Sequence, residues 1–151
     1  MSVVPPAAEQ RIYAERIMTN IFRTLSFVFV AGCVGGVLNS LVVWNFGNLG
    51  VNAALGVKIA PQLTPAWLYP RIVWGGIWGF LFLLPILRRS VISRGLLFSL
   101  GPSLVMLFIV FPMKTNKGML GLALGNMTPV LVLFFNAVWG VAAALWLRFI
   151  R

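Results

Sequence analysis

The chain of 151 residues contains no histidine, no aspartate and a single cysteine. Its acidic side chains are Glu9 and Glu15, both among the first twenty positions. Its apolar stretches therefore lack the usual protein ligands for zinc and haem, and they lack the carboxylates of a membrane proton relay. One cysteine also excludes an internal disulfide or an iron–sulfur cluster held by cysteine thiolates. We expect no metal site and no cofactor.

The usual nucleophile pairings are absent as well. Serine with lysine is the remaining arrangement, but the lysines lie in predicted loops with no serine beside them. We expect no catalytic residues and no enzymatic activity.

Charged residues are scarce, at 9%, while hydrophobic residues reach 60%. Soluble domains average about a quarter charged and about half apolar, so this composition indicates an integral membrane protein. A net charge of +10 would suggest nucleic acid in a soluble chain. Here the basic residues lie between apolar runs, where they anchor helix ends to headgroups. We expect anionic membrane lipids as partners, and no nucleic acid.

Long apolar runs dominate the chain. A membrane-spanning helix needs about 20 largely apolar residues, and four stretches meet or approach this length. They predict an all-α integral membrane protein, a four-helix transmembrane bundle formed by a single domain, 1–151. The predicted spans are residues 22–46, 72–87, 95–112 and 129–150.

An amphipathic segment, 7–21, precedes the first span. It carries Tyr13, Ile17 and Ile21 at four-residue spacing, with charges on its other faces. This pattern predicts a helix that lies in the membrane interface.

Lysine and arginine are distributed unequally between the two sides of the predicted bundle. One side holds eight and the other four. The first set is Arg11, Arg16, Arg23, Arg88, Arg89, Arg94, Arg148 and Arg151, and the second is Lys58, Arg71, Lys114 and Lys117. Because cytoplasmic flanks are enriched in basic residues, both termini are predicted to be cytoplasmic, in what we expect is a bacterial inner membrane.

The two outer loops, 47–70 and 113–128, resemble each other. In each loop and the span after it, the motifs Ala-Leu-Gly, Thr-Pro and Val-Trp-Gly occur in this order. The copies lie at 54–56, 64–65 and 73–75, and at 123–125, 128–129 and 138–140. The match needs gaps, so it reflects either chance and membrane composition or two parallel helix hairpins that are repeats about an axis along the membrane normal. Both loops are glycine-rich and apolar, which favours either re-entrant segments or short interfacial helices.

The stretch Val-Ala-Gly-Cys at 30–33 resembles a lipoprotein cleavage box. The apolar run before it is only about ten residues long and continues well beyond it, as in a stop-transfer helix. We therefore favour Cys33 as a small packing residue over a lipidated one.

Small residues at four-residue spacing occur in every predicted span. Membrane helices associate through close backbone approach, which small side chains permit. The predicted packing residues are Gly32, Gly36, Ser40, Gly75, Gly79, Gly95, Ser99, Ser103, Gly140 and Ala144.

Three polar side chains are predicted at one depth. At about 1.5 Å per residue, Asn39, Trp78 and Asn136 each lie roughly 10 Å below the outer end of their span. One interpretation is a structural clamp, in which the two amides hydrogen-bond to each other. The other is a solute site that opens to the outer side. We favour the clamp.

Two functions remain open on these observations. The favoured one is a small polytopic membrane protein that acts as an accessory, assembly or structural subunit, either in a homo-oligomer or in a larger complex. Arg88, Arg89 and Arg94 are then predicted to bind lipid headgroups. The alternative is a small channel or carrier for a neutral or anionic solute at the hairpin interface.

Overall fold

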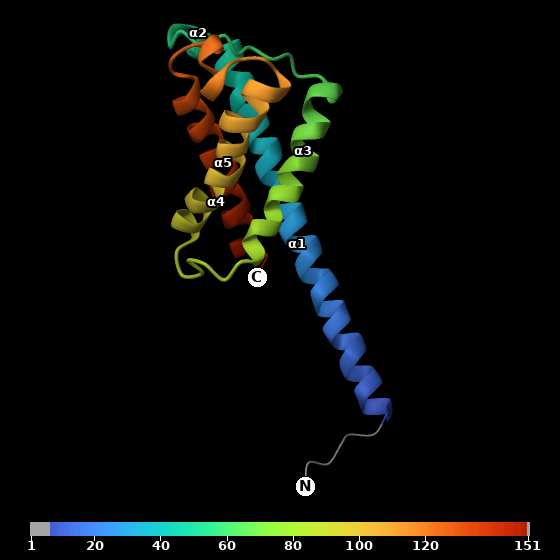
Figure 1. Ribbon diagram of the computed structural model, residues 1–151. Helices are drawn as coiled ribbons and strands as arrows, with labels where there is room; N and C mark the ends of the chain where they lie inside the picture. The colour runs from blue at the N-terminus through green and yellow to red at the C-terminus, as the bar shows by residue number, and fades with distance from the viewer. Residues whose placement is uncertain (1–6, 151) are drawn as a thin grey trace.

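The computed structural model describes residues 7–150, which are helical with no strand in this range (Figure 1). Arg151, one of the predicted basic flanks, lies outside the described residues. The helices, including 3-10 and π segments labelled η, are α1 (Ala7–Asn48), α2 (Val51–Ala54), α3 (Pro65–Gly79), η1 (Phe80–Leu83), α4 (Val91–Val105), η2 (Met106–Lys114), η3 (Met119–Leu124) and α5 (Thr128–Phe149).

Three helical stretches are long and apolar enough to cross a membrane, which is compatible with an integral membrane protein. They are α1, the continuous helix Val91–Lys114 formed by α4 and η2, and α5. The predicted spans 22–46, 95–112 and 129–150 agree with these bounds to within a few residues, except that α1 begins well before residue 22.

The predicted second span, 72–87, corresponds to α3 and η1, which begin and end earlier in the chain. Helix α3 begins at Pro65, because Thr64 accepts a hydrogen bond from the Trp67 N–H and proline fits the first helical turn. Helical structure ends at Leu83, since Leu84 is extended and precedes Pro85, which disfavours helix in the residue before it.

The four longer helices run alternately up and down (Figure 1). Helix α1 packs against both α3 and α5, and α4 packs against α5. Helices α1 and α5 are therefore the central pair, with α3 packed on α1 and α4 packed on α5.

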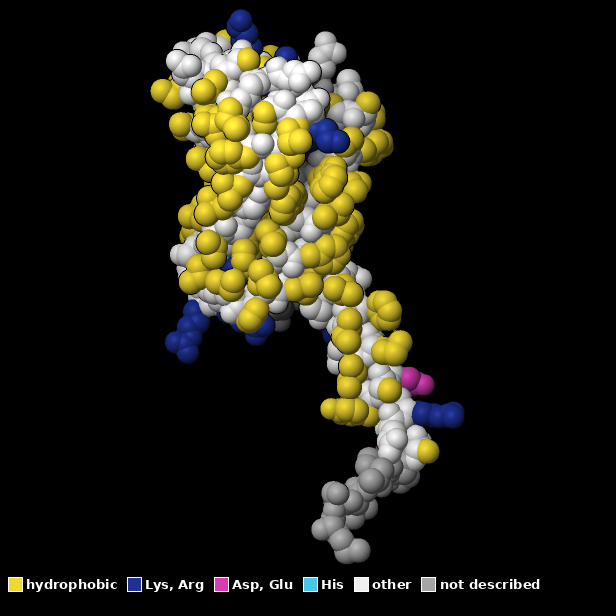
Figure 2. Space-filling model, viewed as in Figure 1, with side chains coloured by type: hydrophobic (Ala, Val, Ile, Leu, Met, Phe, Trp, Pro, Cys, Tyr) yellow, Lys and Arg dark blue, Asp and Glu magenta, His cyan; other side chains and the backbone are white. Residues whose placement is uncertain are grey.

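Helix α1 has no break at the boundary predicted between the interfacial helix, 7–21, and the first span. Its 42 residues form one helix of about 63 Å. The sequence explains this continuity, because no glycine or proline occurs from Ala7 to Ala31. Residues Ala7–Thr24 are exposed throughout and project beyond the rest of the molecule (Figures 1 and 2). We call this segment the arm and residues 25–150 the body.

The body has two buried apolar clusters. One lies toward the arm and includes Val28, Phe82 and Trp139. The other lies toward the outer loops and includes Val43, Val57 and Phe135. Exposed apolar side chains cover the outside of the body, while Lys and Arg lie mostly toward its ends and along the arm (Figure 2). This distribution suits an apolar surrounding between two polar layers.

The two outer loops meet at one end of the body. The Lys58 N–H donates to the Leu124 carbonyl oxygen at 2.8 Å, and the backbones of Gly56 and Gly125 touch. Val57 is buried beneath this contact. The first loop contains the short helix α2 and the second contains η3, so each holds a short helix at the end of the longer ones.

Candidate functional site

All ten predicted packing residues are buried. In the contact between α1 and α3, Gly32 meets Gly75 and Gly79 so closely that an added Cβ would collide with their backbone. Gly36 faces the backbone of Arg71 and Ile72 in the same way. Glycine is required here because the helices approach without side chains between them.

Helices α4 and α5 cross at a second glycine pair. A Cβ on Gly95 would lie 2.5 Å from the carbonyl oxygen of Gly140, and one on Gly140 would collide with Gly95. The Ser103 and Ser99 hydroxyls lie in the same interface, where Ser103 donates to the Ser99 carbonyl at 2.7 Å. The α1–α3 pair and the α4–α5 pair are therefore each joined at glycines.

The predicted hydrogen bond between Asn39 and Asn136 does not form. The Asn39 amide donates to the Phe135 carbonyl of α5 and accepts from Arg71 of α3. The Asn136 amide donates to the Ser103 hydroxyl at 3.1 Å. The prediction used depth alone, and depth does not fix which way a side chain points around its helix.

Trp78, predicted at the same depth as the two amides, contacts a different helix. Its ring packs on Gly101 of α4 beside the inner cluster, and it makes no hydrogen bond with either amide. The indole that joins helices is Trp139, which is 3% exposed and donates to the Gly32 carbonyl at 3.0 Å. Trp139 thus attaches α5 to the glycine crossing of α1 and α3.

Sequence reasoning assigned Arg71 to a flank and missed its contacts. Its Nε donates to the Ser40 hydroxyl at 3.0 Å and its Nη2 to the Asn39 amide oxygen at 2.7 Å. Its guanidinium also lies 4.6 Å from the centre of the Trp67 ring, a cation–π contact. The Thr64-Pro65 start signal was the available clue, because it places Trp67 and Arg71 one turn apart inside a helix.

The three arginines predicted at headgroups fall into two environments. Arg88 and Arg89 are exposed in the loop before α4. Arg94 is 7% exposed, donates to the carbonyl oxygens of Phe82 and Leu84, and lies against the rings of Phe82 and Phe98. Arg94 thus differs from Arg88 and Arg89 in being turned inward, and the headgroup contact of all three stays a prediction.

Cys33 is half-buried in the middle of α1, and its sulfur faces Gly76 of α3. Gly76 has no side chain, so the sulfur fills the space that a larger residue would take. This is the position expected of a small packing residue.

The arm has an apolar face that continues the buried face of α1. Within the body that face contains Val28, Gly32 and Gly35. Two turns before Val28 the same face carries Ile21, and one turn further back it carries Ile17. They are 52% and 43% exposed. The face that packs against other helices in the body is thus left uncovered on the arm.

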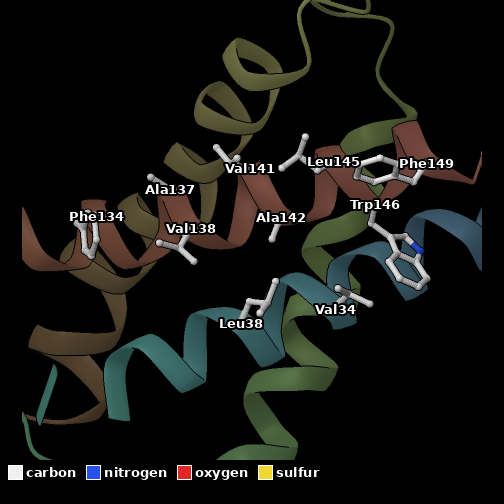
Figure 3. Close-up of a pocket in the computed structure, with 10 residues that line it drawn as sticks. All are labelled: Val34, Leu38, Phe134, Ala137, Val138, Val141, Ala142, Leu145, Trp146 and Phe149. Carbon is white, nitrogen blue, oxygen red and sulfur yellow. The ribbon is translucent and has the colours of Figure 1, made fainter. Parts of the chain in front are cut away.

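A groove of about 540 Å³ runs along the outside of the body between α1 and α5 (Figure 3). Its lining is apolar throughout, with Val34 and Leu38 of α1 facing α5. The α5 lining comprises Phe134, Ala137, Val138, Val141, Ala142, Leu145, Trp146 and Phe149. Such a surface fits an acyl chain or another helix.

Comparison with known protein families, curated proteins and solved structures finds no match to this chain.

Proposed function

We propose that the chain is a small polytopic membrane protein that acts, without catalytic chemistry, as an accessory or assembly subunit through contacts with other helices and with lipid. The observation that carries this proposal is the uncovered apolar face of the arm. Apolar faces on helices are normally buried against a partner surface. The arm is also too charged for the hydrocarbon core, with Arg11, Arg16 and Glu15 on its other faces.

The proposal includes four membrane crossings. Helix α3 and η1 together cover residues 65–83, close to the length that a span needs. Their antiparallel course between the ends of the body supports a crossing (Figure 1). The excess of basic residues at the end that carries the arm supports cytoplasmic termini, in what we propose is a bacterial inner membrane.

A repeat of two hairpins is the second structural element of the proposal. The contact between Gly56 and Gly125 supports it, because these glycines end the two Ala-Leu-Gly copies. The two Thr-Pro copies begin α3 and α5, and Gly75 and Gly140 of the two Val-Trp-Gly copies lie at the two glycine crossings. Equivalent segments of two repeats meet near their common axis.

Cysteine labelling tests the orientation. In a Cys33→Ser background, a cysteine at position 89 is expected to react with an impermeant reagent only from the cytoplasmic side. A cysteine at position 117 is expected to react only from the outer side. Reaction of both from one side contradicts the four-crossing arrangement.

Two isoleucines of the arm provide a matched test of the subunit role. Ile17 lies on the apolar face, whereas Ile12 lies among the charged residues of the opposite face, and both are exposed. Ile17→Asn is expected to release a stoichiometric partner, or a second copy, when the protein is purified from its native membrane in mild detergent. Ile12→Asn is expected to retain it.

The readout is the mass and subunit composition of the purified species, by native mass spectrometry and light scattering. Loss of the same partner in both variants would indicate general damage to the arm. A wild-type chain that purifies alone, with a mass unchanged in Ile17→Asn, contradicts the subunit proposal.

A small anion carrier is the second candidate, and the contacts of Arg71 with Asn39 and Ser40 favour it. Arg71 carries a full charge within α3, its contacts with Asn39 and Ser40 are to neutral groups, and the chain has no carboxylate side chain outside the arm. Uptake of a small anion by proteoliposomes tests this role. Arg71→Gln is expected to abolish uptake and Lys117→Gln to preserve it, whereas absence of uptake by the wild-type protein contradicts the carrier function.

A further inference from the structure

A small cleft lies at the end of the body from which the arm projects. It has a volume of about 170 Å³ and is lined by three arginines from different elements. Arg88 comes from the loop after η1, Arg94 from the first turn of α4 and Arg148 from the last turn of α5. The other lining residues are Phe82, Val91, Ala144 and Leu147.

Arg88 and Arg148 make the cleft cationic, since they are exposed and its lining contains no aspartate or glutamate. The Phe82 and Leu84 carbonyls accept from Arg94 and hold this third guanidinium in place. Val91 is the first residue of α4, so the positive end of that helix dipole adds to the same field.

The geometry separates these arginines by role. Arg94 is buried and already held in one position, so ligand binding costs little additional side-chain entropy there. Arg88 and Arg148 are exposed, and neither makes a side-chain hydrogen bond within residues 7–150. Their donors are available to an incoming acceptor.

We propose that this cleft binds a phosphate group, supplied by the headgroup of an anionic membrane lipid. Planar guanidinium forks match phosphate oxygens and form charge-assisted hydrogen bonds with them. The volume is several times the roughly 30 Å³ that one water takes in the liquid, which suits a phosphate-sized group and not a whole lipid.

The apolar part of the lining favours a lipid over free phosphate. Phe82, Val91, Ala144 and Leu147 offer nothing to a hydrated inorganic ion, but they suit the glycerol and first methylenes of a lipid. The cleft also lies at an end of the body, where the headgroup layer is expected. The proposal deepens the lipid contact of the proposed function, and it rests on the membrane location but not on the arm or on a protein partner.

Neighbouring arginines provide a charge-matched test. Arg88→Gln/Arg148→Gln removes two charges from the cleft lining. Arg23→Gln/Arg89→Gln removes two charges from the same end of the molecule but outside the lining. All four side chains are exposed, so both variants are expected to fold, and thermal unfolding of the purified full-length chain checks this.

The measurement is the dissociation constant of phosphatidylglycerol in a neutral detergent, with phosphatidylcholine and inorganic phosphate as the other probes. Loss of two charge-assisted contacts is expected to weaken phosphatidylglycerol binding by at least about tenfold in Arg88→Gln/Arg148→Gln. Arg23→Gln/Arg89→Gln is expected to stay within about twofold of wild type, as loss of exposed charges is worth little.

Each other result overturns part of the proposal. Equal weakening in both variants would show that only surface charge attracts the lipid, and the cleft would not be a site. Binding of inorganic phosphate without binding of phosphatidylglycerol would make soluble phosphate the ligand and overturn the lipid assignment. Neither result changes the outcome of the arm experiment, so the two proposals fail separately.

Discussion

The two helix pairs, α1 with α3 and α4 with α5, are joined alike but attached to the rest of the body differently. Glycines meet at both crossings. The Val-Trp-Gly copies diverge, however, because Trp139 is 3% exposed whereas Trp74 is 59% exposed. Trp139 binds α5 to α1, and Trp74 leaves α3 without the equivalent attachment to α4. Similar sequence copies can thus produce one tight and one loose interface.

Gly32 is the position where a substitution is expected to do most harm. It touches Gly75 and Gly79 of α3, and its carbonyl accepts from Trp139 of α5. Gly32→Leu is expected to lower the free energy of unfolding by about 3 kcal/mol, because the added side chain has no space on either side. Unfolding by SDS in mixed micelles measures this. Val30→Leu, at an exposed position of the same helix, is the control, and equal losses would refute the close contact.

The two tryptophans test the difference between the pairs directly. Trp139→Phe removes the hydrogen bond to Gly32 and is expected to cost about 1.5 kcal/mol. Trp74→Phe is expected to change the stability little, since Trp74 is exposed and the crossing with α1 is made by glycines such as Gly75 and Gly79. The same SDS unfolding measurement applies. A larger loss for Trp74→Phe would reverse the comparison.

Double-mutant cycles test the polar contacts. Asn39→Leu and Asn136→Leu are expected to add within about 0.5 kcal/mol, because the two amides share no partner. Asn39→Leu and Arg71→Leu are expected to be coupled by about 0.6 kcal/mol or more, since each loses the other's hydrogen bond. Coupling between the two asparagines instead would restore the clamp predicted from sequence.

The two Thr-Pro copies give the smallest expected difference. Thr64→Val removes the oxygen that accepts from Trp67 and is expected to cost about 0.5 kcal/mol. Thr128 is fully buried and its hydroxyl has no hydrogen-bond partner among the described residues. Thr128→Val is therefore expected to be neutral or stabilising. Equal losses on SDS unfolding would show that both threonines act as caps.

Features that depend on local sequence were predicted well. Composition and apolar run length gave the helical membrane class, and four-residue spacing of small side chains gave positions such as Gly32 and Gly140, which are buried. The fourth crossing, the repeat and the orientation stay predictions.

Features that depend on direction around a helix were predicted poorly. Asn39 and Asn136 were predicted at one depth but bond elsewhere, and Arg94 turns inward although Arg88 and Arg89 are exposed. The rotation of a helix about its axis is set by all its contacts together, and these involve residues far apart in the sequence. The sequence predicted Arg88 and Arg94 near headgroups, but the addition of Arg148 depends on the packing of α4 against α5.

Because α1 is unbroken, a tilt of the arm is transmitted along the whole helix. It crosses α3 closely at Gly32, which lies about 37 Å from the arm's tip at Ala7 and about 24 Å from the other end at Asn48. Any tilt about this pivot moves the two ends in opposite directions, the outer end by about two thirds as much. The outer end leads directly into α2 and the contact between the loops. In the proposed topology, a partner bound to the arm would therefore be connected to the outer loops by one continuous helix.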